Sequence, residues 1–68
     1  MFKPGQMVRV DLAGMQVGDV LFHAAVTDAV GNIVRQVSEQ PEVYLVKLLF
    51  SFKGVSEVEV SASRIRAA

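Results

Sequence analysis

Few side chains in this sequence have the chemistry of a catalytic group. His23 is the only histidine, and histidine is the residue whose ordinary pKa lies near neutral pH, which suits it to general acid–base catalysis. It stands between the apolar residues Phe22 and Ala24, and no acidic residue beside it would orient the imidazole. We therefore expect His23 to be a structural or interface residue.

Two carboxylates offer a second kind of chemistry. Glu57 and Glu59 are two positions apart, so they would share one face of a strand, and paired carboxylates can act as general acid and general base. Lys47 and Lys53 belong to the same expected hairpin, which favours solvated ion pairs on an exposed strand instead. The serines follow neither a triad nor a nucleophile-elbow pattern. We predict no catalytic residue.

Metal and cofactor patterns are missing as well. The chain has no cysteine and one histidine, whereas a structural zinc site takes four ligands, mostly from those two residue types. The glycines are dispersed among expected turns and do not follow a phosphate-binding spacing. We expect no metal and no cofactor.

Length and composition favour a partner. The 68 residues are expected to form one domain, residues 1–68. A domain of this size buries only about 60% of the surface of its unfolded chain, so it usually needs a disulfide, a metal or another subunit for stability. A hydrophobic fraction of 51% and a mean hydropathy of +0.38 also favour oligomerisation.

Charge indicates which partners to expect. Seven basic and seven acidic residues give a formal net charge of zero, which provides no general attraction to nucleic acid or to anionic membranes. No apolar run approaches the roughly 20 residues of a membrane span, and the first residues lack the apolar segment of a secretion signal. We expect a cytoplasmic location and no membrane contact.

Strand patterns dominate the chain and would position these side chains. Residues 5–12 alternate polar and apolar side chains, which is typical of a half-buried strand; a loop at 13–18 follows. Residues 19–37 are expected to form a hairpin, because Asp28 and Gly31 occupy the first and fourth positions of a type I turn. A helix over residues 20–30 is the alternative.

The second half of the chain predicts another hairpin. After a break around Pro41, residues 43–52 form the longest expected strand, and a three-residue loop at 53–55 would set Leu49 opposite Glu59. A strand at 56–63 follows, with one 3₁₀ turn near 61–65 before a short last strand. The expected core residues are Val8, Val10, Phe22, Val46, Leu48, Phe50, Val58 and Val60.

Three segments in this order are similar to a known fold. "FKPGQMVRV" resembles the opening strand of Src-homology-3-like small barrels, "GDVLFHAAV" resembles their second strand, and "VSEVEVSASRIRAA" resembles their closing strand, 3₁₀ turn and last strand. The resemblance implies an all-β small barrel of five to six antiparallel strands. Residues 29–42 would form a longer second hairpin than the minimal barrel has.

The closing segment also resembles that of the plasmid-encoded type II dihydrofolate reductases, which are tetramers of such barrels around a shared pore. Their pore strand carries Val-Gln-Ile-Tyr, whereas Val58-Glu59-Val60-Ser61 stands here. No active-site residue is therefore transferred, and a pore-type enzyme is kept only as an alternative function.

Apolar residues on the outer strand faces indicate the function that we expect. In "YLVKLLFSF" (44–52), Leu45 and Leu49 share a face with Lys47, and a small chain has no second layer to cover them. We expect a non-enzymatic protein-interaction module that forms a homo-oligomer, a dimer or a tetramer, most simply through a two-fold contact. Its predicted interface comprises Leu21, His23, Ile33, Val37, Leu45 and Leu49.

Nucleic-acid binding is the remaining alternative. Small barrels that bind nucleic acid combine a basic groove with stacking aromatic rings. Lys53, Arg64 and Arg66 could form such an edge, but Phe2 is the only aromatic residue that the strand pattern leaves off a core face. We do not expect nucleic acid to be a partner.

Overall fold

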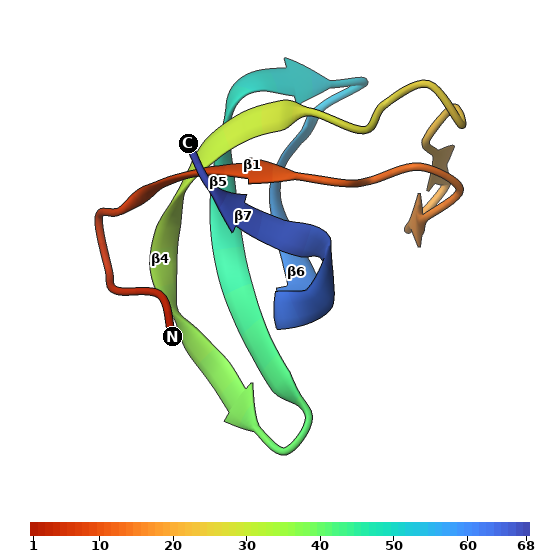
Figure 1. The fold of residues 1–68 in the computed structure, drawn as a ribbon. Helices are drawn as coiled ribbons and strands as arrows, with labels where there is room; N and C mark the ends of the chain where they lie inside the picture. Colours follow the sequence, from red (N-terminus) through yellow and green to blue (C-terminus); the bar gives the residue numbers. More distant parts are fainter.

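The computed structural model describes residues 1–68 as an all-β protein (Figure 1). The order of elements is β1 (Met7–Val10), β2 (Gln16–Val17), β3 (Val20–Leu21), β4 (Ala29–Glu39), β5 (Glu42–Phe52), β6 (Val55–Ser61), the 3₁₀ helix η1 (Ala62–Arg64) and β7 (Ile65–Ala67). The predictions of an antiparallel all-β protein and of a 3₁₀ turn before the last strand are confirmed.

Five strands form one antiparallel sheet in the order β6-β5-β4-β1-β7, and β2 pairs with β3 in a separate hairpin. The sheet curves strongly, so that β6 and β7 approach the same side of the molecule (Figure 1). No ladder joins β6 to β7, and the sheet is therefore open, with these two strands as its edges.

The first strand follows its sequence pattern. Val8 and Val10 alternate with exposed Met7 and Arg9 along β1, and Leu12 continues the buried row. β1 lies between β4 and β7, with Val10 opposite both Ala29 and Ile65. This position in the sheet explains why its inward side chains are completely enclosed.

The hairpin predicted around residues 28–31 is wrong. β4 runs without a turn from Ala29 to Glu39, and the chain reverses instead at Gln40-Pro41, between β4 and β5. Gly31 is buried inside β4 opposite Leu48, where a Cβ would lie 2.5 Å from the carbonyl oxygen of Lys47. Glycine is therefore required here by close approach of two strands, not by a turn.

The segment "GDVLFHAAV", which resembles a second barrel strand, also has a different structure. Only Val20–Leu21 within it is a strand, β3, and the chain then turns at Ala24 and Ala25 before β4 begins. The strand beside β1 in the main sheet is β4. The expected loop at 13–18 contains β2, so residues 16–21 form a small hairpin of their own.

The turn between β5 and β6 is one residue shorter than expected. Phe52 is opposite Val55, and Lys53 and Gly54 between them have φ of 50° and 86°, which is the geometry of a two-residue type I′ turn. The predicted pairing of Leu49 with Glu59 is wrong, since Leu45 stands opposite Glu59.

Twelve buried apolar residues form one core, and seven of the eight expected core residues are among them. Phe50 is the exception, because it is 77% exposed. The rings of Phe22 and Phe52 meet edge to face at 5.5 Å, and Phe52 covers one margin of the core. Tyr44, completely buried, holds the N-terminal segment through an edge-to-face contact with Phe2 at 5.4 Å.

Candidate interaction surface

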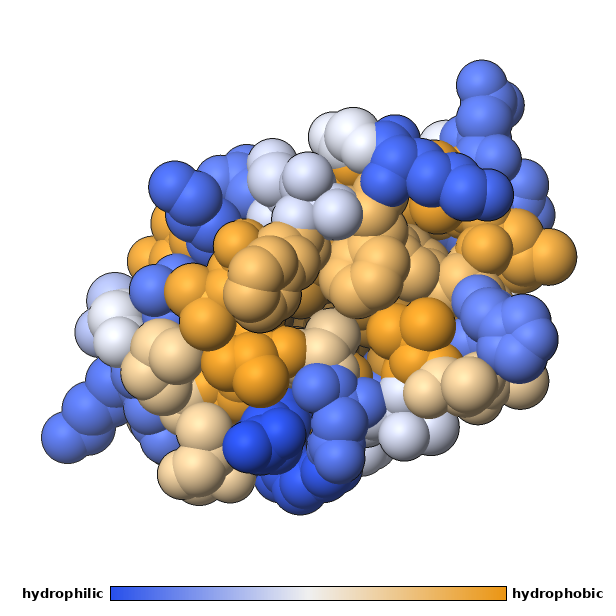
Figure 2. Space-filling model, turned by 90° about the horizontal axis from the view of Figure 1, so that it is seen from above, coloured by the Kyte–Doolittle hydropathy of each residue, from blue (hydrophilic) through white to orange (hydrophobic).

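Three large apolar side chains are strongly exposed on neighbouring elements. Leu21 on β3 is 67% exposed, and Leu49 and Phe50 near the end of β5 are 55% and 77% exposed. We call these three residues the apolar face. Figure 2 looks down on the side of the molecule where β5 ends, and apolar side chains cover much of the middle of this view. Large apolar side chains that are exposed on a protein surface in this way commonly mark a contact with another molecule.

Irregular pairing of β5 explains why Phe50 points outward. Lys47 is opposite Glu57 and Phe52 is opposite Val55, so four residues of β5 span the distance covered by Ser56 alone. Leu49, Phe50 and Ser51 have no register partner on β4 or β6. A bulge of this size breaks the strict alternation of side chains. The inward row of β5 is therefore interrupted after Leu48, and Phe52 packs against the core again.

A groove of about 350 Å³ separates the end of β5 from β3. Phe22 and Phe52 line it together with Leu21, and its polar residues are His23, Ser51 and Lys53. The remaining lining residues are Val20 and Val26. No carboxylate lines this groove, so its polar margin carries hydrogen-bond donors and a positive charge.

The imidazole of His23 is fixed by the turn that follows β3. Its Nδ1 atom accepts a hydrogen bond from the backbone N–H of Ala25 at 3.0 Å. In a neutral imidazole the proton then resides on Nε2, which leaves an N–H donor available on an exposed residue. His23 thus uses Nδ1 for a hydrogen bond within its own turn, and its Nε2–H group remains available for a hydrogen bond with another molecule.

A second hollow, of about 430 Å³, lies where residues 15–17 approach β5 and β6. We call it the socket, and its lining residues are Met15, Gln16, Val17, Leu45, Glu57, Val58 and Glu59. Leu45, half-buried, shares this hollow with residues of its own chain. Part of the surface expected to await a partner is therefore covered from within.

The structure separates the predicted interface residues into two groups. Leu21, His23, Val37 and Leu49 are exposed and Leu45 is half-buried. Ile33, by contrast, is 2% exposed and belongs to the core. Its placement on the outer face was wrong, because it rested on a turn at residues 28–31 that would have reversed the faces of β4.

The three predicted nucleic-acid contacts are not gathered into one edge. Lys53 lies in the β5–β6 turn. Arg64 on η1 donates from one terminal nitrogen to the backbone carbonyls of Asp11 and Ala13, at 3.1 and 3.3 Å.

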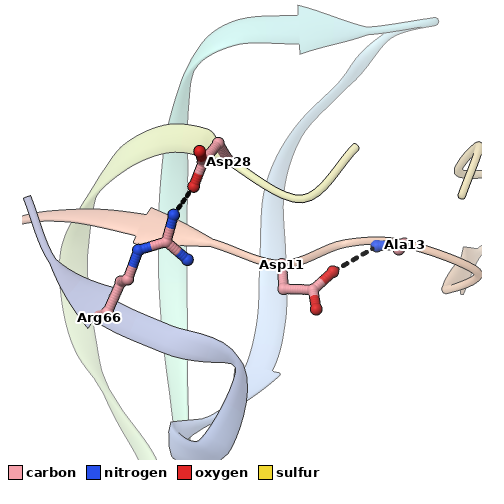
Figure 3. Close-up of polar contacts among 4 residues, drawn as sticks. All are labelled: Asp11, Ala13, Asp28 and Arg66. Carbon is pink, nitrogen blue, oxygen red and sulfur yellow. Dashed lines mark hydrogen bonds and ion pairs between the residues drawn. The ribbon is translucent and has the colours of Figure 1, made fainter. Parts of the chain in front are cut away.

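Arg66 forms an ion pair with Asp28 (Figure 3). Close by, the carboxylate of Asp11 accepts a hydrogen bond from the backbone N–H of Ala13 at 3.0 Å and so shapes the loop that Arg64 holds (Figure 3). Phe2, expected to be free, packs against Tyr44.

One titratable side chain has a displaced pKa. The hydroxyl of Tyr44 donates a hydrogen bond to the carboxylate of Glu42, which raises the pKa of this tyrosine, while the backbone N–H of Phe2 donates to the same hydroxyl at 3.2 Å and opposes the effect. These bonds join β5 to the N-terminal segment and are structural in character.

No group of three or more His, Cys, Asp or Glu side chains is arranged to hold a metal ion. The structure also has no helix with the length and apolarity needed to cross a membrane. The surface features described above are the exposed apolar side chains, the two hollows and the charged side chains that line them.

Sequence reasoning missed Phe50 and the residues that form the socket with β5. The exposure of Phe50 depends on the bulge in β5, and no glycine, proline or other turn residue in this part of the sequence indicates that bulge. The contribution of Met15, Gln16 and Val17 depends on the path of a loop. Comparison of the chain with protein-family models, curated proteins and solved structures finds no match.

Proposed function

We propose that this chain is a small non-enzymatic protein-interaction module that acts as a homo-oligomer. The observation that carries the proposal is the apolar face, where Leu21, Leu49 and Phe50 are each more than half exposed. Burying one such side chain completely is worth about 1.5–3 kcal/mol. In a chain of 68 residues with no disulfide, a subunit contact over this face would supply a substantial part of the stability.

The finer architecture that we propose is a Src-homology-3-like barrel. Support comes from the closing segment, where β6, the 3₁₀ turn η1 and the short β7 follow in the order of the resemblance, and β7 returns to pair with β1. The β4–β5 hairpin spans residues 29–52, so residues 29–42 supply its first strand and its turn and are not a separate hairpin. Since this fold serves many functions, the functional proposal rests on the surface and not on the architecture.

The alternatives have less support. Arg64 and Arg66 are engaged within the chain, which weakens the case for a nucleic-acid edge. The segment compared with the pore motif of type II dihydrofolate reductases reads Val58-Glu59-Val60-Ser61 in this chain and lacks the glutamine and tyrosine of that motif. Val58 and Val60 lie in the core.

Sedimentation velocity of the wild type at micromolar concentration tests the proposal. The expected result is a species larger than one chain, and Leu49→Glu should shift it to the monomer, because a buried charge opposes association. Val34→Glu is the matched control, since Val34 is an exposed apolar residue that does not belong to the apolar face. A wild type that stays monomeric would contradict the proposed function.

A further inference from the structure

The β5–β6 hairpin ends in a projecting apolar and cationic feature. Phe50 is the most exposed aromatic side chain of the protein, and Lys53 follows it in the type I′ turn. Lys53 has no ion-pair partner, since the ion pair between Arg66 and Asp28 is the only one in the structure. We call Phe50 and Lys53 the tip.

The turn geometry fixes the backbone position of Lys53 in the tip. The turn has two residues, with Phe52 paired to Val55 immediately below it, and Phe52 is anchored by its edge-to-face contact with Phe22. Lys53 adopts φ of 50°, a region that side chains other than glycine, asparagine and aspartate seldom occupy. The backbone of Lys53 is therefore held at this position by the hairpin, and its ammonium group forms no ion pair within the chain.

The socket has the complementary properties. Its apolar residues are Met15, Val17, Leu45 and Val58, and its charged residues are Glu57 and Glu59. No cation lines it, and neither glutamate has an ion-pair partner. Lys47 is opposite Glu57 in the register but does not form an ion pair with it. The socket is thus an apolar hollow with an acidic margin.

We propose that the tip of one copy inserts into the socket of another copy, with Phe50 on the apolar floor and Lys53 beside Glu57 and Glu59. This assignment rests on the proposed homo-oligomer and names the two surfaces that meet in it. Charge complementarity selects this pairing, because contact between two tips would bring Lys53 against Lys53 and contact between two sockets would bring four carboxylates together. The volume of the socket, about 430 Å³, falls in the range of cavities that accept aromatic side chains or small ligands.

Two variants separate the two surfaces. Phe50→Ser removes the ring of the tip and leaves the socket intact, whereas Glu57→Lys with Glu59→Lys reverses the socket charge and leaves the tip intact. All three positions are exposed, so circular dichroism should show that each variant folds. Each variant alone should associate at least about thirtyfold more weakly than the wild type, the effect of removing a central contact of an interface.

The decisive experiment mixes the two variants in equal amounts at high protein concentration and follows them by sedimentation velocity. The intact socket of one variant should accept the intact tip of the other, which gives a one-to-one heterodimer that grows no further. The same heterodimer should weaken as salt concentration rises, because its ion pairs lie at an exposed margin.

Each other outcome identifies what has failed. Two variants that remain monomers after mixing, beside an oligomeric wild type, would overturn the tip-and-socket contact and leave the proposed function standing. A Phe50→Ser variant that oligomerises like the wild type would overturn it as well. Lys53→Glu provides a second tip variant, and it should be rescued in the same way. A monomeric wild type would overturn both proposals together.

Discussion

Gly31 and Lys47 lie so close across the β4–β5 ladder that a Cβ on Gly31 would come within 2.5 Å of the Lys47 carbonyl oxygen. The neighbouring contact is a buried side chain, Val46, at 2.9 Å. Neither group is the far end of a flexible side chain, so any larger residue at position 31 must push two strands apart. This close approach sets the spacing in the middle of the main sheet.

Gly31→Ala should therefore destabilise the protein, although alanine is generally better tolerated than glycine in a strand. The expected loss is about 1–3 kcal/mol, the usual cost of overpacking a core. Urea denaturation followed by circular dichroism measures it. Asn32→Ala, at the next and half-exposed position of β4, is the control and should stay within about 0.5 kcal/mol of the wild type. Equal stability of Gly31→Ala and the wild type would show that the strands separate freely.

Leu48 and Phe50 should respond in opposite ways to truncation. Leu48→Ala removes a buried side chain and should cost about 2–5 kcal/mol. Phe50→Ser should change the stability of the dissociated chain by less than about 0.5 kcal/mol, as expected for an exposed position. Thermal unfolding in dilute solution compares the two variants. A large loss of stability in Phe50→Ser under these conditions would indicate that the Phe50 ring is buried in the core.

The decrease in the free energy of unfolding at alkaline pH should depend on Tyr44. Its pKa is raised by the bond to Glu42, so the folded protein holds the phenolic proton more tightly than the unfolded chain does. The resulting stabilisation is complete below the ordinary tyrosine pKa of about 10 and is lost as the pH rises through the higher pKa of the folded state.

Two measurements check this expectation. Because Tyr44 is the only tyrosine, an ultraviolet titration reports its ionisation alone, and its midpoint should lie above that of the unfolded chain in urea. Tyr44→Phe should be less stable than the wild type near neutral pH, and the difference between them should shrink at strongly alkaline pH. A midpoint at or below the unfolded value would contradict the bond.

The two arginines near the end of the chain should differ in their effect on stability. Arg64→Ala breaks two hydrogen bonds to the backbone of residues 11 and 13, and a charged donor of this kind is worth about 1.5–3 kcal/mol per bond at most. Arg66→Ala breaks an ion pair whose side chains are more than half exposed, which should cost less than about 1 kcal/mol. Parallel urea titrations rank the two, and a reversed order would contradict the structural role of Arg64.

Local patterns predicted those elements whose inward rows are regular. Val8 and Val10 on β1 and Val58 and Val60 on β6 alternate strictly with polar residues, and all four are buried. The 3₁₀ turn expected near residues 61–65 forms at Ala62–Arg64. These elements depend on short stretches of sequence, and the long-range contacts agree with them.

Errors arose where a distant contact outweighs a local pattern. Asp28 and Gly31 fit a type I turn. In the fold, however, Gly31 lets β4 pass close to the backbone of Lys47, and Asp28 forms an ion pair with Arg66 on β7. Phe50 continues an alternating row that the bulge in β5 interrupts. For the candidate site, Leu21 and Leu49 were predicted on the surface, whereas the exposure of Phe50 depends on the folded register.

The pairing of β7 with β1 has a consequence for how the protein is made. Ile65 stands opposite Val10, and the backbone N–H of Asp11 donates to the carbonyl of Arg64 at 2.8 Å. A nascent chain therefore cannot complete its main sheet until residues 65–67 have emerged from the ribosome. Until that moment one edge of β1 has no partner strand, and the core lacks Ile65. The main sheet therefore forms only after β7 is available, and until then the unpaired edge of β1 can be bound by a chaperone.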